Sequence, residues 1–130
     1  MLDTTIVSHV VRGHPAVIER MIAMPVTALC LSSITAGELT YGLAKRPPSR
    51  TRAAAVAEFL NRVEVLPWEE TASRRYGLLR AELERHGKGL GPLDTLIAAH
   101  ALAVDAILVT SDGAFSSVTG LQVEDWTDLK

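Results

Sequence analysis

Short apolar segments alternate with longer helix-like segments along the whole chain, and this alternation is the feature that most limits its fold. The longer segments repeat apolar residues at helical spacing, whereas the short apolar runs are typical of buried strands. Strands separated by helices join through right-handed crossovers, which favour a parallel sheet. We therefore predict an α/β fold in which helices cover both faces of a mostly parallel sheet of about four or five strands.

The predicted elements follow one another in a regular order. Strands are expected at residues 1–3, 27–33, 63–67 and 106–111, with a further edge strand at 121–126. Helices are expected at residues 5–12, 15–24, 34–46, 50–62, 69–86 and 92–104. Paired prolines predict an exposed loop at 45–50. The chain has 130 residues, an ordinary size for one domain, so we predict a single domain over 1–130.

Composition excludes several classes of protein. The 13 basic and 15 acidic residues give a net charge of −2, which is unlike a strongly basic nucleic-acid binder. Acids neutralised by a bound metal would nevertheless leave a net basic surface. No uninterrupted apolar run reaches the roughly 18 residues that span a membrane, and the N-terminus lacks the layout of a secretion signal. A single cysteine, Cys30, fits a reducing compartment, so we expect a cytoplasmic protein.

Asp94 stands out because it lies in the first turn of an otherwise mostly apolar helix, in the stretch "GPLDTLIAAHALAV". Gly91 suits the N-cap and Pro92 the first helical position, which places Asp94 in the first turn. A carboxylate there faces the positive end of the helix dipole, a gain of about 0.3–1 kcal/mol. Acidic residues are ordinary at helix starts, so a functional role for Asp94 depends on the other acids of the chain.

Three further acids are expected at the same edge of the predicted sheet. Asp3 ends the first strand, Glu38 lies early in the helix after the second strand, and Asp112 follows the strand "AILVT". Ligands of such folds bind at the carboxyl ends of the strands. Like charges raise one another's pKa, and a hard cation relieves the crowding. Oxygen ligands favour Mg²⁺ or Mn²⁺, ions that activate water in phosphodiester cleavage.

Four motifs carry these acids: "MLDTTI", "SSITAGELTYG", "GPLDTLIAAHAL" and "LVTSDGAF". In this order and spacing they resemble the motifs of PIN-domain ribonucleases, and most closely those of the VapC toxins of bacterial toxin–antitoxin pairs. The resemblance runs from Met1 to "VEDW" at 123–126. It implies a three-layer α/β/α domain that cuts RNA at a Mg²⁺- or Mn²⁺-dependent acidic site. The family's catalytic and metal-binding positions map onto Asp3, Glu38, Asp94 and Asp112.

The resemblance also implies partners. These are a homodimer and a cognate VapB-like antitoxin, a small protein whose tail wraps the toxin and places a basic residue near the acids. An arginine fork can pair with two carboxylates and would compete with metal and phosphate. The helices around "PAVIERMIAM" and "SITAGELTYGLA" have more apolar positions than one buried face requires. We therefore predict that these helices form an apolar groove for the tail.

One position departs from the family pattern, because Thr5 stands where the family usually has Asn. A Thr hydroxyl is shorter than an Asn amide and offers one donor. Thr5 is expected either to serve the same role less well than Asn, which would lower the activity, or to cap the first helix. Thr110 and Ser111 are expected either to orient Asp112 or a metal-bound water, or to be ordinary turn residues.

Other residues have structural explanations. His9, His14, His86 and His100 show no ligand spacing, and His100 is expected to be a satisfied or surface histidine. Arg80 and Arg85 share a helix with Glu82 and Glu84, as on an exposed face of mixed charge. The tyrosine and tryptophan side chains favour core or interface roles over base stacking; these are Tyr41, Trp68 and Tyr76.

Besides a ribonuclease, the sequence leaves two alternative functions open, and experiments can distinguish them. An aspartyl-phosphate phosphohydrolase is suggested by "LDTT" after a short strand, but that chemistry needs a second acid at the position of Thr5. It would form a covalent phosphoryl group on Asp3. The other alternative is a non-catalytic binding module, a PIN fold that is kept for protein or RNA contact after the change at Thr5. Such a module would keep its RNA affinity in EDTA and leave the RNA uncut when metal is present.

Overall fold

The computed structural model describes residues 1–46 and 49–127, and its elements follow the predicted alternation. The helices are α1 Thr4–Val11, α2 Pro15–Ile22, α3 Ser33–Lys45, α4 Arg50–Arg62, α5 Glu70–Arg85 and α6 Pro92–Ala103. The strands are β1 Cys30–Ser32, β2 Glu64–Leu66, β3 Leu108–Val109 and β4 Val123–Glu124. All six predicted helices are confirmed, with ends that differ by no more than two residues. Residues 47 and 48 of the predicted 45–50 loop lie outside the described residues.

The prediction of one sheet with four or five strands is wrong. The structure has two two-stranded sheets, β1 with β2 and β3 with β4, and both pairs are parallel as predicted. The N-terminal segment lies between the two sheets, where Leu2 forms a parallel bridge with Val109 of β3 and a hydrogen bond with Cys30 of β1. The Leu2 N–H donates to the Cys30 carbonyl at 2.9 Å, and the Val109 N–H donates to the Met1 carbonyl at 2.8 Å.

The sheets stay small because local signals end the strands early. The first segment cannot continue as a strand, since the Asp3 side chain caps α1 immediately and accepts a hydrogen bond from the Thr4 N–H. The predicted strand 27–33 loses its first residues to a 3₁₀ turn, Val26–Ala28, and its last residue to α3. Ser32 serves as the N-cap of α3 with its side-chain oxygen. These capping interactions compete with the sheet hydrogen bonds for the same residues.

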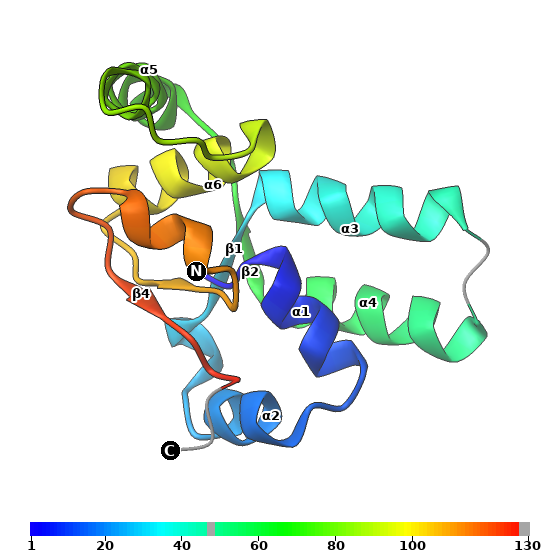
Figure 1. Ribbon diagram of the computed structural model, residues 1–130. Coiled ribbons are helices and arrows are strands. Elements are labelled where there is room, and N and C mark those ends of the chain that lie inside the picture. Colours follow the sequence, from blue (N-terminus) through cyan, green and yellow to red (C-terminus); the bar gives the residue numbers. More distant parts are fainter. Residues whose placement is uncertain (47–48, 128–130) are drawn as a thin grey trace.

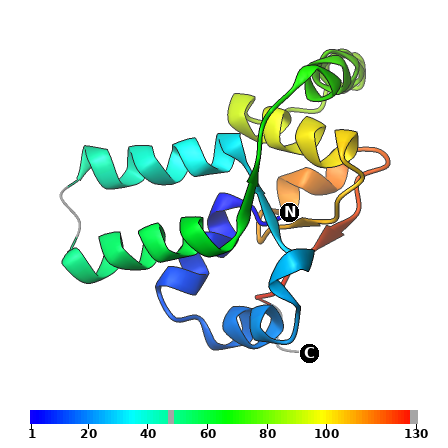
Figure 2. The same ribbon diagram turned by 180° about the vertical axis from the view of Figure 1, so that it is seen from behind.

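Helices pack on both faces of the short strands. Consecutive strand residues point to opposite faces, and Leu2, Leu31 and Val109 accordingly join one apolar cluster with side chains of α1, α2 and α4. Met1 and Leu108 join a second cluster with side chains of α5 and α6. Figure 1 and Figure 2 show α3 and α4 side by side, extending from the strands on the side away from α5. The short strands thus bring several strand ends and helix starts together.

Helix α6 crosses the interior and brings a histidine with it. His100 is buried, and its Nδ1 lies 2.7 Å from the Ser32 Oγ. Burial lowers the pKa of His100, although the charge of Glu69 acts in the opposite direction. The expectation of a satisfied histidine is therefore confirmed. Within residues 1–46 and 49–127, the helices are all too short or too polar to cross a membrane.

Candidate active site

Asp3 is held from several sides at the point where the first segment meets α1. It is only 3% exposed. Its Oδ1 accepts a hydrogen bond from the Thr4 N–H at 2.7 Å. Its Oδ2 accepts from the Thr110 hydroxyl at 2.7 Å and from the Thr5 hydroxyl at 3.3 Å. Together these hydrogen bonds fix the orientation of the Asp3 carboxylate.

Thr110 links Asp3 to a second acid. Its buried hydroxyl donates to Asp3 and accepts a hydrogen bond from the Asp112 N–H at 3.0 Å. The Asp112 Oδ1 accepts from the Ala114 N–H at 2.9 Å and caps the 3₁₀ turn Gly113–Ser117. One hydroxyl group at the end of β3 therefore contacts both Asp3 and the backbone of Asp112.

Glu38 reaches the same region from α3. The Thr4 hydroxyl donates to the Glu38 Oε1 at 2.8 Å, so the residue next to Asp3 holds the third acid. No role for Thr4 was predicted from the sequence. The signal available was a hydroxyl residue directly after the acid in "LDTT", but two threonines follow Asp3 and the spacing alone does not distinguish them.

Thr5 lies within α1 and faces the acids, which resolves one of the two expectations for it. The helix cap is Asp3, so the alternative that Thr5 caps the first helix is wrong. Besides donating to Asp3, the Thr5 hydroxyl accepts from the Ser111 N–H at 3.3 Å and lies 3.5 Å from the Thr110 hydroxyl. Ser111 thus takes part through its backbone.

Asp94 completes the group from the first turn of α6. Its pKa is raised to about 6, first by burial and then by the charges of Asp3, Asp112 and Glu38. Each of these charges opposes ionisation of Asp94, because like charges in a partly buried site repel. The other three sequence-predicted acids are therefore close enough to Asp94 for their charges to act on it, although the four come from separate segments of the chain.

The site supplies oxygen donors for a cation. Within the described residues, no three Asp, Glu, His or Cys side chains meet as a preformed metal cluster. The nearness of the acids to one another is therefore indicated by the effect of their charges on Asp94, and not by a preformed set of metal ligands. The surrounding donors are carboxylate and threonine oxygens, which by chemistry fit a hard divalent ion such as Mg²⁺ or Mn²⁺.

The carboxylate crowding predicts a pH-dependent stability difference. Between the ordinary value of 3.8 and the raised pKa of about 6, folded metal-free protein keeps a proton on Asp94 that the unfolded chain releases. Wild type therefore loses stability across this range, and Asp94→Asn does not. At pH 7 the variant will be more stable by on the order of 1 kcal/mol, allowing for solvent screening. Urea unfolding in EDTA at pH 4 and pH 7 measures this; a difference independent of pH contradicts it.

Comparison with known proteins identifies the class to which this fold and site belong. The family model described as PIN domain matches residues 1–121. The tRNA(fMet)-specific endonuclease VapC of Shigella flexneri is 36% identical over 98% of this chain and 97% of its own length. Ribonuclease VapC2 of Haemophilus influenzae is 35% identical over 97% and 96%.

Solved structures agree with these sequence matches. VapBC2 from Rickettsia felis, bound to a promoter DNA fragment, matches with a TM-score of 0.88 and 33% identity over 97% of both chains. DNA-bound VapBC from Salmonella typhimurium matches with a TM-score of 0.89 and 35% identity over 97% of this chain and 96% of that chain. The chain belongs to the PIN-domain family and, within it, to the VapC ribonucleases, the toxins of toxin–antitoxin pairs.

Proposed function

We propose that the chain hydrolyses RNA phosphodiester bonds at Asp3, Glu38, Asp94 and Asp112 in a Mg²⁺- or Mn²⁺-dependent reaction. The observation that carries the proposal is the set of hydrogen bonds by which Thr4, Thr5 and Thr110 join Asp3, Glu38 and the backbone of Asp112 at one place. The charges of these three acids also contribute to the raised pKa of Asp94, after burial. The four acids come from segments that are far apart in the sequence, and the charges of three of them act on the fourth, Asp94. The oxygen-only donor set and the membership in the VapC ribonucleases support the same proposal.

The four acids and the three threonines beside them have separate roles in this proposal. The four carboxylates would hold the cation, which when bound supplies Lewis acidity and an activated water. Thr110 and Thr5 orient the Asp3 carboxylate through their hydroxyl groups, and Thr4 orients Glu38. Such supporting hydrogen bonds fix the direction of a ligand oxygen and tune its affinity for a cation.

Cleavage of total RNA tests the proposal. Purified protein will fragment RNA in Mg²⁺ or Mn²⁺ and will leave it intact in EDTA. RNA that is bound but uncut with either metal would favour the binding module. A covalent phosphoryl group trapped on Asp3 would favour the phosphohydrolase. Two relatives are named as tRNA(fMet)-specific endonucleases, so tRNA(fMet) is the first defined substrate to test, with an elongator tRNA as the comparison.

The substitution Thr5→Asn tests the supporting role of residue 5. The Thr5 hydroxyl contacts Asp3 at 3.3 Å, a long hydrogen bond. The longer Asn side chain provides two donors and an acceptor, so we expect tighter Mn²⁺ binding or faster cleavage, within the roughly 10–100-fold range of supporting residues. Metal titrations and cleavage rates of both proteins measure the effect. Unchanged values would show that the Thr5 contact is not limiting.

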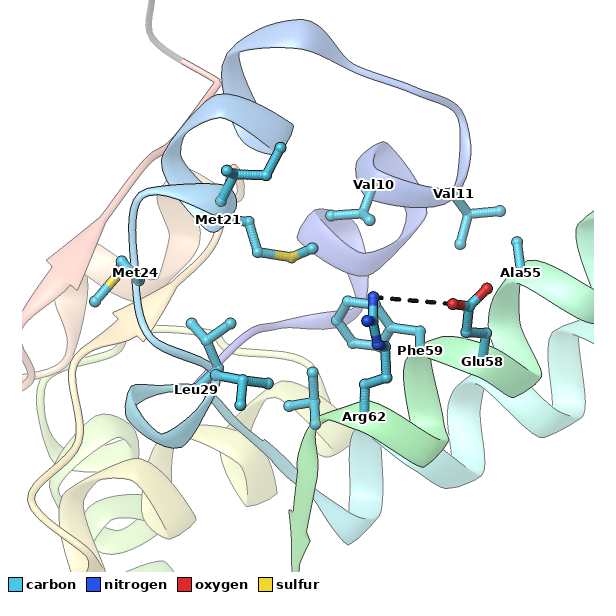
Figure 3. Close-up of a pocket in the computed structure, with 12 residues that line it drawn as sticks. Val10, Val11, Met21, Met24, Leu29, Ala55, Glu58, Phe59 and Arg62 are labelled. Atoms are coloured by element: carbon cyan, nitrogen blue, oxygen red, sulfur yellow. Dashed lines mark ion pairs between the residues drawn. The ribbon is translucent and has the colours of Figure 1, made fainter.

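An apolar groove lies among α1, α2, α4 and the turn before β1, and Figure 3 shows its lining. The groove has a volume of about 560 Å³. Its charged lining residues are Glu58 and Arg62, an exposed ion pair with a 3.8 Å separation. Ile22 is 76% exposed and Val26 is 52% exposed. A water-exposed apolar surface of this kind marks a site for another protein segment.

The groove supports a proposal for the antitoxin partner. The solved relatives VapBC2 and VapBC are toxin–antitoxin assemblies, and we propose that this groove holds an amphipathic helix of the cognate antitoxin. Of the two helices predicted to form a groove for the tail, α2 lines this groove through Met21 and Ile22. The prediction for α3 is wrong, because the groove is completed by α1 and α4. Apolar α3 residues such as Leu39 pack into the core instead. The homodimer stays a prediction.

The double substitution Ile22→Asp/Val26→Asp tests this docking site. Placing two carboxylates in an apolar contact will weaken antitoxin binding at least about 100-fold, while RNA cleavage by the free toxin stays within about twofold. Val104→Asp is the control, because Val104 is an exposed apolar residue outside the groove lining.

Growth of a bacterial host provides the readout. Wild type and the Val104→Asp control will be neutralised by co-expression of the small antitoxin expected beside the toxin gene, whereas the groove variant will remain toxic. Full rescue of the groove variant would place the antitoxin elsewhere. Equal growth of cells with and without the antitoxin, for wild type, would contradict a toxin role.

A further inference from the structure

A second groove, which we call the α5 groove, lies between α5 and the first turn of α6. It has a volume of about 320 Å³, and its lining includes Tyr76, Arg80, Lys88, Pro92 and Thr95. Pro92 and Thr95 flank Asp94 in the first helical turn. A Cβ atom placed on Gly91, which lies between the lining residues Leu90 and Pro92, would be 3.6 Å from the Asp94 Oδ2. The Asp94 carboxylate therefore lies next to this end of the α5 groove.

The charged side chains of the α5 groove are suited to an anion. Arg80 and Lys88 are basic, and Glu84 is the acid that accompanies them. The Arg80 Nε donates to the Glu84 Oε2 at 3.2 Å, but both side chains are more than 60% exposed, so this pairing is weak in water. The Arg80 Nη1 donates to the Tyr76 hydroxyl at 3.0 Å. A guanidinium has five N–H donors, and these two bonds leave others for a phosphate.

An aromatic ring stands beside this guanidinium. Tyr76 packs edge-to-face on Trp68, with ring centroids 6.3 Å apart and an interplanar angle of 71°. Trp68 in turn donates from its Nε1 to the Leu96 carbonyl of α6 at 3.1 Å. The Tyr76 ring is therefore supported by the helix that carries Asp94. Proteins that bind single-stranded RNA combine such rings, which stack on bases, with cations that contact the backbone.

We propose that the α5 groove binds the single-stranded RNA next to the bond that is cut, with Arg80 and Lys88 on backbone phosphates and Tyr76 against a base. The inference rests on the proposed ribonuclease function. RNA is a polyanion and four carboxylates repel it, so cations close to the acids are needed to hold the strand. The sequence indicated only an exposed face of mixed charge for Arg80; the groove comes from the packing of α5 on α6.

Binding of a fluorescein-labelled single-stranded RNA of mixed sequence tests the inference. Anisotropy in EDTA at 50–200 mM salt gives the Kd and its salt dependence. Arg80→Ala/Lys88→Ala will raise the Kd about tenfold and lower the slope of log Kd against log salt by about 1.4, from two phosphate contacts at about 0.7 each. Arg12→Ala/Arg74→Ala removes the same charge outside the lining and will change the Kd less than about twofold.

Tyr76→Leu separates stacking from charge. It will weaken RNA binding about tenfold with an unchanged salt slope. In metal-dependent cleavage, both α5-groove variants will raise KM and leave kcat within about twofold, and circular dichroism will confirm that they fold. If the Arg80/Lys88 variant matches the control in Kd and slope, the inference is overturned, even if wild type cuts RNA. If wild type binds RNA through these residues but never cuts it, the proposed function fails, and RNA binding by the α5 groove stands without the cleavage site beside it.

Discussion

Asp94→Asn will cut RNA at least about 100-fold more slowly than wild type and will keep its fold. Asn has the shape of Asp but lacks the charge needed to hold a divalent ion, and even supporting residues of such sites contribute roughly 10–100-fold. The fold tolerates the change because a neutral side chain avoids the burial of a charge and the repulsion by the other acids, the two causes that raise the pKa of Asp94. Cleavage of a defined RNA in Mn²⁺ gives the rate, and circular dichroism gives the fold.

The same result is expected for neutralisation of Asp3, Glu38 or Asp112. Glu70→Gln is the matched control, because Glu70 is an exposed acid paired with Arg74 on α5. This variant will cut RNA at the wild-type rate. A wild-type rate for Asp94→Asn would remove Asp94 from the site. Equal losses in Asp94→Asn and Glu70→Gln would show that total charge matters and the acidic cluster does not.

Thr110→Val will reduce cleavage by about 10–100-fold, although Thr110 holds no charge. Its hydroxyl is the group that contacts both the Asp3 carboxylate and the Asp112 N–H. Valine keeps the shape but leaves the Asp112 N–H without this partner, so the free energy of unfolding will also fall by about 1–3 kcal/mol. Cleavage rates and urea unfolding measure the two effects.

Thr110→Ser keeps the hydroxyl and will retain most of the activity, which separates loss of the hydrogen bonds from loss of the methyl group. Thr40→Val is the control for removing a hydroxyl elsewhere, because Thr40 bonds only the Ala36 carbonyl on an exposed part of α3. If Thr110→Val keeps wild-type activity, the orientation of Asp3 does not depend on this link.

The helices could be predicted from the sequence because local spacing and capping residues define them. The apolar spacing of α6, for example, is interrupted only near its ends by polar residues, and Pro92 begins the helix. The sheet could not be predicted to the same extent. β3 and β4 have two residues each, and no local pattern distinguishes such a strand from an extended segment. Their lengths depend on competition between capping and strand pairing.

The four acids of the candidate site could be selected from the sequence by their positions at strand ends and helix starts and by the motifs around them. Their supporting hydrogen bonds were not. The bond between Thr110 and Asp3 joins residues 107 positions apart, so its existence depends on the pairing of the N-terminal segment with β3. The apolar groove likewise depends on the packing of α4 against α1. In the sequence, α3 was predicted to line the groove instead of these helices, because it has more apolar positions than one buried face requires.

Binding of Mn²⁺ is the most direct test of the claim that the four carboxylates form one metal site. Isothermal titration calorimetry of metal-free protein will show Mn²⁺ binding for wild type and for Glu70→Gln with the same Kd. Each neutralisation at Asp3, Glu38, Asp94 or Asp112 will weaken binding at least about tenfold. Equal Mn²⁺ affinity in wild type and in Asp94→Asn, or no Mn²⁺ binding by folded wild type, would contradict the account.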